Sequence, residues 1–184
     1  MSYATLGQLK EYLGITGATE DALLTRLLDA ASAAIDARCG RRFVATTATK
    51  LLTRERIVGD AFLLPDDLLT LTSVVTDEGD TLLPAHFVSF SAPTRTLRAR
   101  HDAPAWGVKY TATVTGVWGY SSTVTHDIVQ ACVRLVGWMY RSKDAQVFDV
   151  TGQVTVNATA VSSRLPTDVV QLLTPYVALE ASVW

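Results

Sequence analysis

The stretch THDIVQACVRLVGWMYRSKDA, residues 125–145, predicts a long helix with an unusually wide apolar face. At 100° per residue, Val133 extends this face on one side and Trp138 lies at its boundary. The apolar arc covers roughly half of the circumference, where about a third is usual. The helix is therefore predicted to be covered on two sides, by its own fold or by a neighbouring molecule. The side chains on the face itself are Ile128, Val129, Cys132, Leu135, Val136, Met139 and Tyr140.

Capping signals predict two helices upstream of this one. Thr5 and Gln8 have the spacing of a capping box, and Gly14 follows the short apolar stripe behind them. A longer apolar stripe begins after Thr19, a good N-cap residue, and stops at Gly40. Both segments have the apolar spacing of helices that bury one face.

The middle of the chain changes from the helical period to the alternation that is typical of strands. Residues 45–120 are rich in Thr and Val and contain turn signals, and the clearest strand is predicted at 109–118. Beyond the long helix, residues 145–164 carry little charge and predict a long, exposed arm. Thr167 then begins a short helix.

The expected fold class is α+β. We expect a small antiparallel bundle of about four helices, with a β-rich insert between the second and third helices. In this interpretation, residues 1–44 and 121–184 form the helical core with its C-terminal arm, and residues 45–120 form the insert.

Composition and charge argue against several classes of function. The chain has 184 residues, of which 48% are hydrophobic and 18% charged, and its formal net charge is -2. Proteins that hold nucleic acid by neutralising phosphates are usually basic, so this balance argues against a dedicated DNA-binding protein. Cys39 and Cys132 are expected to be small buried residues. No signal peptide or membrane span is visible, so we expect a protein that is made in the cytoplasm.

No arrangement typical of an enzyme or a metal site is found in the sequence. His86, His101 and His126 have no spacing that suggests shared metal ligation, and phosphate-binding loops and a nucleophile elbow are missing. Asp66 and Asp67 would point to opposite faces of a strand, which makes them poor partners in acid–base catalysis, and we expect a turn there. No catalytic residue, metal or cofactor is predicted.

Two charged surfaces can each be interpreted in two ways. The basic run RTLRARH, residues 95–101, is either the solvated face of an edge strand or a contact for an acidic partner or passing DNA. Asp29 and Asp36 share one face of the second helix. That face is either exposed to solvent or lines a conduit from which it repels DNA.

Three stretches, in this order, resemble the head–tail connector, or adaptor, proteins of long-tailed DNA bacteriophages and related gene-transfer particles. They are LGQLKEYLGITGATEDALLTRLLDAASAAIDARCGRRF (residues 6–43), VTGVWGYSSTVTHDIVQACVRLVGWMYR (114–141) and SSRLPTDVVQLLTPYVAL (162–179). Small members of that family connect their second and third helices briefly. The long β-rich middle departs from them, and the resemblance assigns it no role.

The resemblance implies a structural virion protein at the head–tail junction, without catalytic residues, that is made in the cytoplasm of a host bacterium. It implies a ring, commonly of twelve subunits, beneath the portal protein. The ring would extend the DNA channel and offer a docking surface to a stopper or tail-side neck protein. DNA would pass through without sequence-specific binding, and no membrane would be involved.

Three sets of site residues follow from the helix pattern and the resemblance. The expected contacts with the adjacent subunit are Val133, Trp138, Tyr140 and Arg141. The C-terminal portion is expected to dock on the portal, through Val154, Val156, Leu165, Tyr176 and Trp184. Asp29 and Asp36 are the candidates for channel lining.

Other functions fit the sequence less well. The alternative structural role is a head-closure (stopper) protein or another tail-side neck protein, but those are mostly β-structured and the expected helical frame argues against them. A DNA-binding regulator would need a basic recognition helix, whereas the two long helices carry carboxylates. A small enzyme would need a catalytic constellation, and none is present in the sequence.

Overall fold

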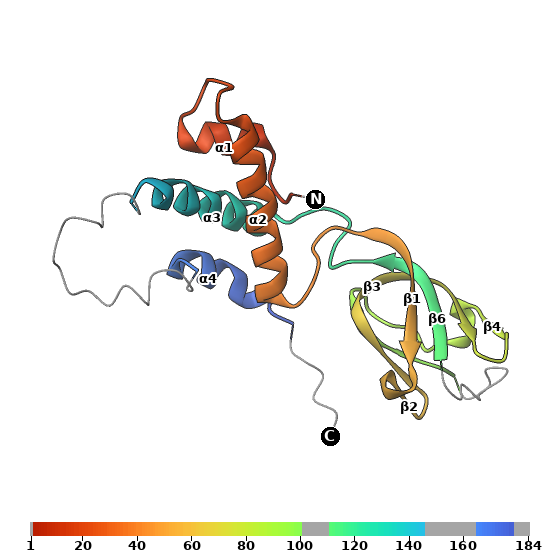
Figure 1. Ribbon diagram of the computed structural model, residues 1–184. Coiled ribbons are helices and arrows are strands. Elements are labelled where there is room, and N and C mark those ends of the chain that lie inside the picture. The colour runs from red at the N-terminus through yellow and green to blue at the C-terminus, as the bar shows by residue number, and fades with distance from the viewer. Residues whose placement is uncertain (1, 101–110, 146–164, 179–184) are drawn as a thin grey trace. The chain divides into compact units, whose positions relative to one another are not determined.

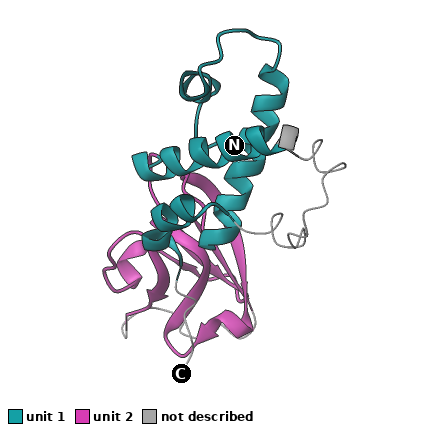
Figure 2. Cartoon of the chain, turned by 90° about the vertical axis from the view of Figure 1, so that its left-hand side faces the viewer, with its two compact units in different colours: residues 1–40, 124–184 teal, residues 41–123 magenta. Residues whose placement is uncertain are grey.

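The structure, a computed structural model of the full chain, describes residues 2–100, 111–145 and 165–178 (Figure 1). The chain divides into two compact units (Figure 2). Residues 1–40 and 124–184 form the first, the helical unit, and residues 41–123 form the second, the β unit. That the segments 1–44 with 121–184 and 45–120 act as separate domains stays a proposal.

The described part of the helical unit contains α1 (Leu6–Leu13), α2 (Asp21–Cys39), α3 (His126–Ala145) and α4 (Thr167–Leu173), followed by the 3₁₀ turn η4 (Thr174–Tyr176). The predicted capping box is confirmed at α1. The Gln8 N–H donates to the Thr5 hydroxyl, and the Thr5 N–H donates to the Gln8 side chain. Gly14 ends α1 at φ 70° and Gly40 ends α2 at φ 61°, where a residue with a Cβ would be strained.

The wide apolar face of α3 is covered in large part by the same chain, because α3 packs against α1, α2 and α4. Gly137 lets α1 come close, since an added Cβ would lie 2.9 Å from Cε1 of Tyr12. Trp138 remains 36% exposed at the edge of the face. The apolar α3 residues buried in this packing are Ile128, Ala131, Cys132, Val133, Leu135 and Val136.

The described part of the β unit contains the strands β1 (Thr46–Thr53), β2 (Ile57–Val58), β3 (Ala61–Thr76), β4 (Thr81–Leu82), β5 (Thr94–Arg98) and β6 (Thr111–Trp118). Two 3₁₀ turns, η1 (Arg54–Arg56) and η2 (Pro84–His86), lie between them. All strand pairs are antiparallel, in the order β1-β6-β3-β2, and β4 and β5 also pair with β3. The alternation predicted for β6 is confirmed, because every second residue from Ala112 to Trp118 is buried.

The sheet is organised around β3, which changes partners along its length. Its first residues pair with β2 and β5, and its residues after Leu68 pair with β6 and β4, while Leu68 itself pairs with both β5 and β6. Pro65 lies where the register with β5 shifts, between Leu63 and Leu68. Proline lacks an N–H for the ladder and is tolerated at such an irregularity. The two halves of β3 therefore serve different parts of the sheet.

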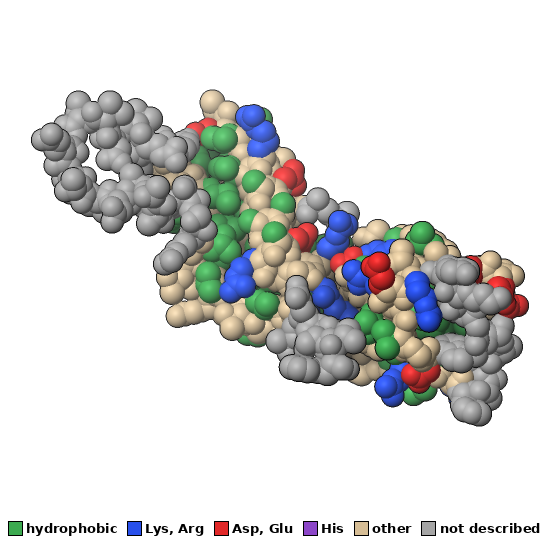
Figure 3. Space-filling model, turned by 60° about the horizontal axis from the view of Figure 1, so that its bottom comes forward, with side chains coloured by type: hydrophobic (Ala, Val, Ile, Leu, Met, Phe, Trp, Pro, Cys, Tyr) green, Lys and Arg blue, Asp and Glu red, His purple; other side chains and the backbone are tan. Residues whose placement is uncertain are grey.

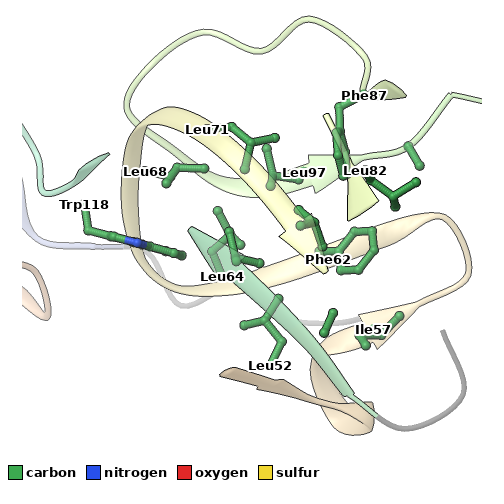
Figure 4. Packing of buried hydrophobic residues seen from close by; sticks show 14 residues of the cluster. Leu52, Ile57, Phe62, Leu64, Leu68, Leu71, Leu82, Phe87, Leu97 and Trp118 are labelled. Carbon is green, nitrogen blue, oxygen red and sulfur yellow. The ribbon is translucent and has the colours of Figure 1, made fainter. Parts of the chain in front are cut away.

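All six strands contribute side chains to the core of the β unit (Figure 4). The ring of Phe62 packs edge-on against Phe87, with 5.9 Å between centroids. The indole N–H of Trp118 donates to the Ala48 carbonyl at 2.9 Å, which satisfies the polar atom of a large buried ring. The largest fully buried members are Leu52, Phe62, Leu68, Leu82 and Leu97, each worth about 1.5–3 kcal/mol of burial.

The expected architecture, a helical bundle that carries a β-rich insert, is wrong. The structure is mixed α+β, and its six-stranded antiparallel sheet with a continuous hydrophobic core dominates (Figure 1). The turn expected at Asp66 and Asp67 is also wrong, because both residues lie inside β3. The sixteen residues of β3 replace what the sequence suggested were short strands separated by turns.

Cys132 provides a test of the helical core. Burial raises the pKa of the Cys132 thiol, although hydrogen bonding to Ser32, whose Oγ lies 3.7 Å from Sγ, works in the opposite direction. Because the neutral thiol is unreactive, we expect alkylation of Cys132 in the folded chain to be at least about 100-fold slower than in urea. The raised pKa also means that this group stabilises the fold below its unfolded pKa, and that the contribution is lost as the pH rises through the folded value.

The measurement is mass spectrometry of the cysteine peptides after timed labelling at neutral pH. Cys39 is also buried and serves as an internal comparison. Fast labelling of Cys132 in the folded chain at neutral pH would contradict the packing described above.

Candidate functional site

A groove lies on the helical unit between α1 and the first half of α3. Its volume is about 530 Å³, and Tyr12, Val129 and Val133 supply its apolar surface. Tyr12 is 44% exposed, which is high for an aromatic ring, whereas Val133 is only 5% exposed. The polar lining residues are Gln8, Glu11, His126, Asp127 and Gln130.

The groove carries acidic charge. Asp127 accepts a hydrogen bond from the Tyr176 hydroxyl at 2.8 Å, which ties η4 to the start of α3. Glu11 is exposed and makes no ion pair with any of the described residues. An apolar groove with an acidic rim suits a partner that brings a basic and partly apolar surface.

The residues expected at a subunit contact do not share one environment. Val133 lies in the groove and is almost fully buried within its own chain. The Tyr140 hydroxyl donates to the Glu20 carboxylate, and this hydrogen bond joins α3 to the N-cap of α2. Trp138 and Arg141 are exposed and remain available to a neighbouring molecule.

The residues expected to dock on the portal are only partly described. Leu165 and Tyr176 are half-buried in the helical unit, and Tyr176 makes the hydrogen bond to Asp127. Val154, Val156 and Trp184 lie outside the described residues.

The two aspartates expected to line a channel differ in their surroundings. Asp29 is exposed on α2. Asp36 is half-buried and accepts a hydrogen bond from the Tyr3 hydroxyl, while the Tyr3 N–H donates to the Ser32 hydroxyl at 3.0 Å. Asp36 therefore anchors the N-terminal residues on α2, and Asp29 is the one that faces water.

A buried ion cluster in the β unit escaped the sequence analysis. Asp67 is 3% exposed, and its carboxylate lies 3.3 Å from Nε of Arg95 and 3.6 Å from Nε of Arg41. The guanidinium of Arg41 also stacks over the Tyr120 ring, 4.9 Å from its centroid. Asp66 points the other way and pairs with Lys50. The basic residue Arg95, which looked like part of a solvated face, thus serves partly as an internal counter-ion.

One face of the molecule is drawn in space-filling form in Figure 3. Hydrophobic side chains form a band on the helical unit, while basic and acidic side chains are interspersed on the β unit (Figure 3). Among the described residues, no group of three or more His, Cys, Asp or Glu side chains is arranged to hold a metal ion. The described helices also include none that is long and apolar enough to cross a membrane.

Comparison with solved structures relates this fold to components of virus-like particles. It is similar to a chain in the neck of an empty gene transfer agent particle computed with C6 symmetry, with a TM-score of 0.65 and 19% identity. A chain from the virion of a native gene transfer agent particle has a TM-score of 0.64 and 20% identity. A chain in the neck of the native particle, computed with C12 symmetry, has 0.62 and 18%. Each match covers 96% of this chain and 90% of the other, and shows the likeness of the folds.

A family model described as head completion protein matches residues 3–179. The chain belongs to the head completion protein family, which consists of structural proteins of phage-like virions. No curated protein matched the sequence. Family membership confirms the resemblance to head–tail connectors, and it confirms that the protein is not an enzyme.

Proposed function

We propose that this protein forms a homo-oligomeric ring of twelve copies beneath the portal, where it extends the DNA channel and offers a docking surface to the next neck or tail component. The observation that carries the proposal is the likeness, over 96% of the chain, to neck chains whose particles were computed with C6 and C12 symmetry. A closed ring needs two different complementary surfaces on each copy.

Within this proposal, Trp138 and Arg141 contact an adjacent copy directly. Val133 and Tyr140 support that contact from within α3, because one is buried and the other is tied to Glu20. Docking on the portal is assigned to the C-terminal portion, with Leu165 and Tyr176 at its base and Val154, Val156 and Trp184 beyond the described residues. Asp29 and Asp36 stay the candidates for channel lining, and only Asp29 is fully exposed.

A head-closure or stopper protein is the second candidate. Such proteins are mostly β-structured, and the six-stranded sheet that dominates this fold fits them better than the expected helical frame does. An image of the assembled neck distinguishes the two roles. An adaptor contacts the portal directly, whereas a stopper lies one layer further toward the tail.

Replacing Trp138 by aspartate is expected to weaken ring assembly by about tenfold or more while the helices stay folded. A tryptophan at the centre of a contact is a common hot spot, and a desolvated carboxylate in its place is unfavourable. Ring formation is measured by electron microscopy of the variant mixed with purified portal, and helicity by circular dichroism.

Val88→Asp is the matched control for this variant. Val88 is 50% exposed on the β unit and has no role in the proposal. If Trp138→Asp loses helicity together with assembly, Trp138 belongs to the internal core. If it assembles as well as Val88→Asp does, it lies outside the subunit contact.

A further inference from the structure

The β unit carries exposed arginines near an exposed valine, one through the strand register and two through the turn that precedes the valine in sequence. The strand register places Val58, Ala61 and Arg98 side by side across β2, β3 and β5. Their neighbours Ile57, Phe62 and Leu97 are buried, so these three side chains point outward. Val58 is 48% exposed, and Arg98 is exposed as well. Arg54, Arg56, Val58 and Arg98 are called the arginine face below.

The arginine face is positively charged, and the described residues of its own chain do not neutralise it. Arg54 and Arg56 belong to η1, which immediately precedes β2 at one end of the β unit (Figure 1). Among the described residues, Arg54, Arg56 and Arg98 make no ion pair. Glu55 and Asp60 lie at the same end and reduce the charge, but they are outnumbered by the arginines.

The helical unit is the more acidic half of the chain. Residues 1–40 and 124–184 contain ten Asp and Glu against seven Lys and Arg, whereas residues 41–123 contain eight against nine. The groove between α1 and α3 adds to this bias, with Tyr12 exposed in it and with Glu11, which forms no ion pair within the described part of the chain, at its rim.

We propose that the groove of one copy binds the arginine face of an adjacent copy. Glu11 and Asp127 would face Arg98 and Arg56, and Val58 would enter the apolar part of the groove. The contact is heterologous, because it joins two different surfaces, and each chain carries one of each. The proposal rests on the ring described above and adds a second pair of surfaces to the contact that Trp138 and Arg141 make in it.

A second copy of this chain accounts for both surfaces together, which is why it is preferred over other occupants. DNA would match the arginine face, but it would leave the acidic groove without a partner. The formal net charge of -2 also does not favour binding to phosphates.

Reversing one charge should weaken the contact, and reversing both should restore it. Glu11→Arg would place like charges opposite each other and is expected to weaken self-association of the full-length chain by about tenfold or more. Arg98→Glu is expected to do the same. The variant that carries both changes should associate within about threefold of the wild type, since opposite charges face each other again.

Asp80→Arg is the matched control, because it makes the same change of charge at an exposed turn next to β4. Association is measured by sedimentation over a concentration series and by counting rings on purified portal. The contact is refuted if Glu11→Arg behaves like Asp80→Arg, or if the double variant is as weak as the two single effects combined.

The remaining outcomes distinguish a failure of this contact from a failure of the proposed ring. If all variants form rings equally well, the ring stands and the proposed contact is wrong. If the wild type stays monomeric in solution and on portal, both are wrong. If Arg98→Glu lowers binding of a short DNA duplex but leaves association unchanged, the arginine face binds DNA and the proposed contact is wrong.

Discussion

Replacing Asp67 by alanine is expected to lower the free energy of unfolding by about 3 kcal/mol, because it leaves two arginines without their buried counter-ion. The Asp67 side chain is 4% exposed, and those of Arg41 and Arg95 are 15% and 24% exposed. The remaining access to water keeps the cost at the lower end of the range for broken buried pairs. Nε of Arg41 and Oδ2 of Asp67 are buried and attract each other as charges without a hydrogen bond between them.

The neighbouring aspartate supplies the control for this prediction. Asp66 pairs with Lys50, and both side chains keep about a quarter of their exposure, at 27% and 25%. Asp66→Ala is therefore expected to cost less than about 1 kcal/mol. Urea unfolding followed by circular dichroism, at low and high salt, compares the two variants. Similar losses for Asp66→Ala and Asp67→Ala would show that the cluster does not stabilise the β unit.

The helices could be predicted because their signals are local. The capping box at Thr5, the glycine stops and the apolar period of α3 each lie within a few residues of the feature that they specify. The alternation of β6 is local in the same sense. Such patterns report which side of an element is buried, and they do not report what buries it.

The full extent of β3 could not be predicted, because its middle resembles a turn. Pro65, Asp66 and Asp67 in succession normally interrupt a strand. Here the strand continues because the register shifts at the proline and because Asp67 finds cationic partners far away in the chain. A buried aspartate can be recognised only when its partners are known, and these partners lie in segments before and after β3 in the sequence. Because the sequence does not indicate one long strand here, it also does not indicate the continuous sheet that dominates the fold, and the helical-bundle expectation was wrong for this reason.

The candidate site could likewise be predicted only where its features are local in the sequence. The sequence indicates that α3 is covered on two sides, and the structure assigns much of that covering to α1, α2 and α4. The groove arises between Tyr12 and Val133, which are far apart in sequence and share no pattern. The basic run 95–101 kept two interpretations because alternation alone does not show that Arg95 turns inward to Asp67 while Arg98 stays outside.

Replacing Gly116 by alanine is expected to destabilise the β unit by about 3 kcal/mol or more, because a Cβ at this position meets rigid backbone. The added carbon would lie 2.3 Å from the Thr70 carbonyl oxygen and 2.9 Å from Cδ1 of Leu68. Gly116 pairs with Leu71, between two shifts of register in which β3 gains residues relative to β6. The glycine thus allows the irregular part of β3 to press against the neighbouring strand.

A backbone carbonyl cannot rotate away as a side chain does, so the clash can be relieved only by moving β3 and with it the core residues that this strand supplies. Gly17→Ala is the matched control, since nothing lies within 4 Å of a Cβ there, and its effect should stay within about 0.5 kcal/mol. Both variants are compared by urea unfolding of the full-length chain, with tryptophan emission as a second probe because Trp118 lies in the same strand. If the Gly116→Ala protein were as stable as the Gly17→Ala protein, β3 and β6 could not be as close as described. The register between these two strands would then be wrong.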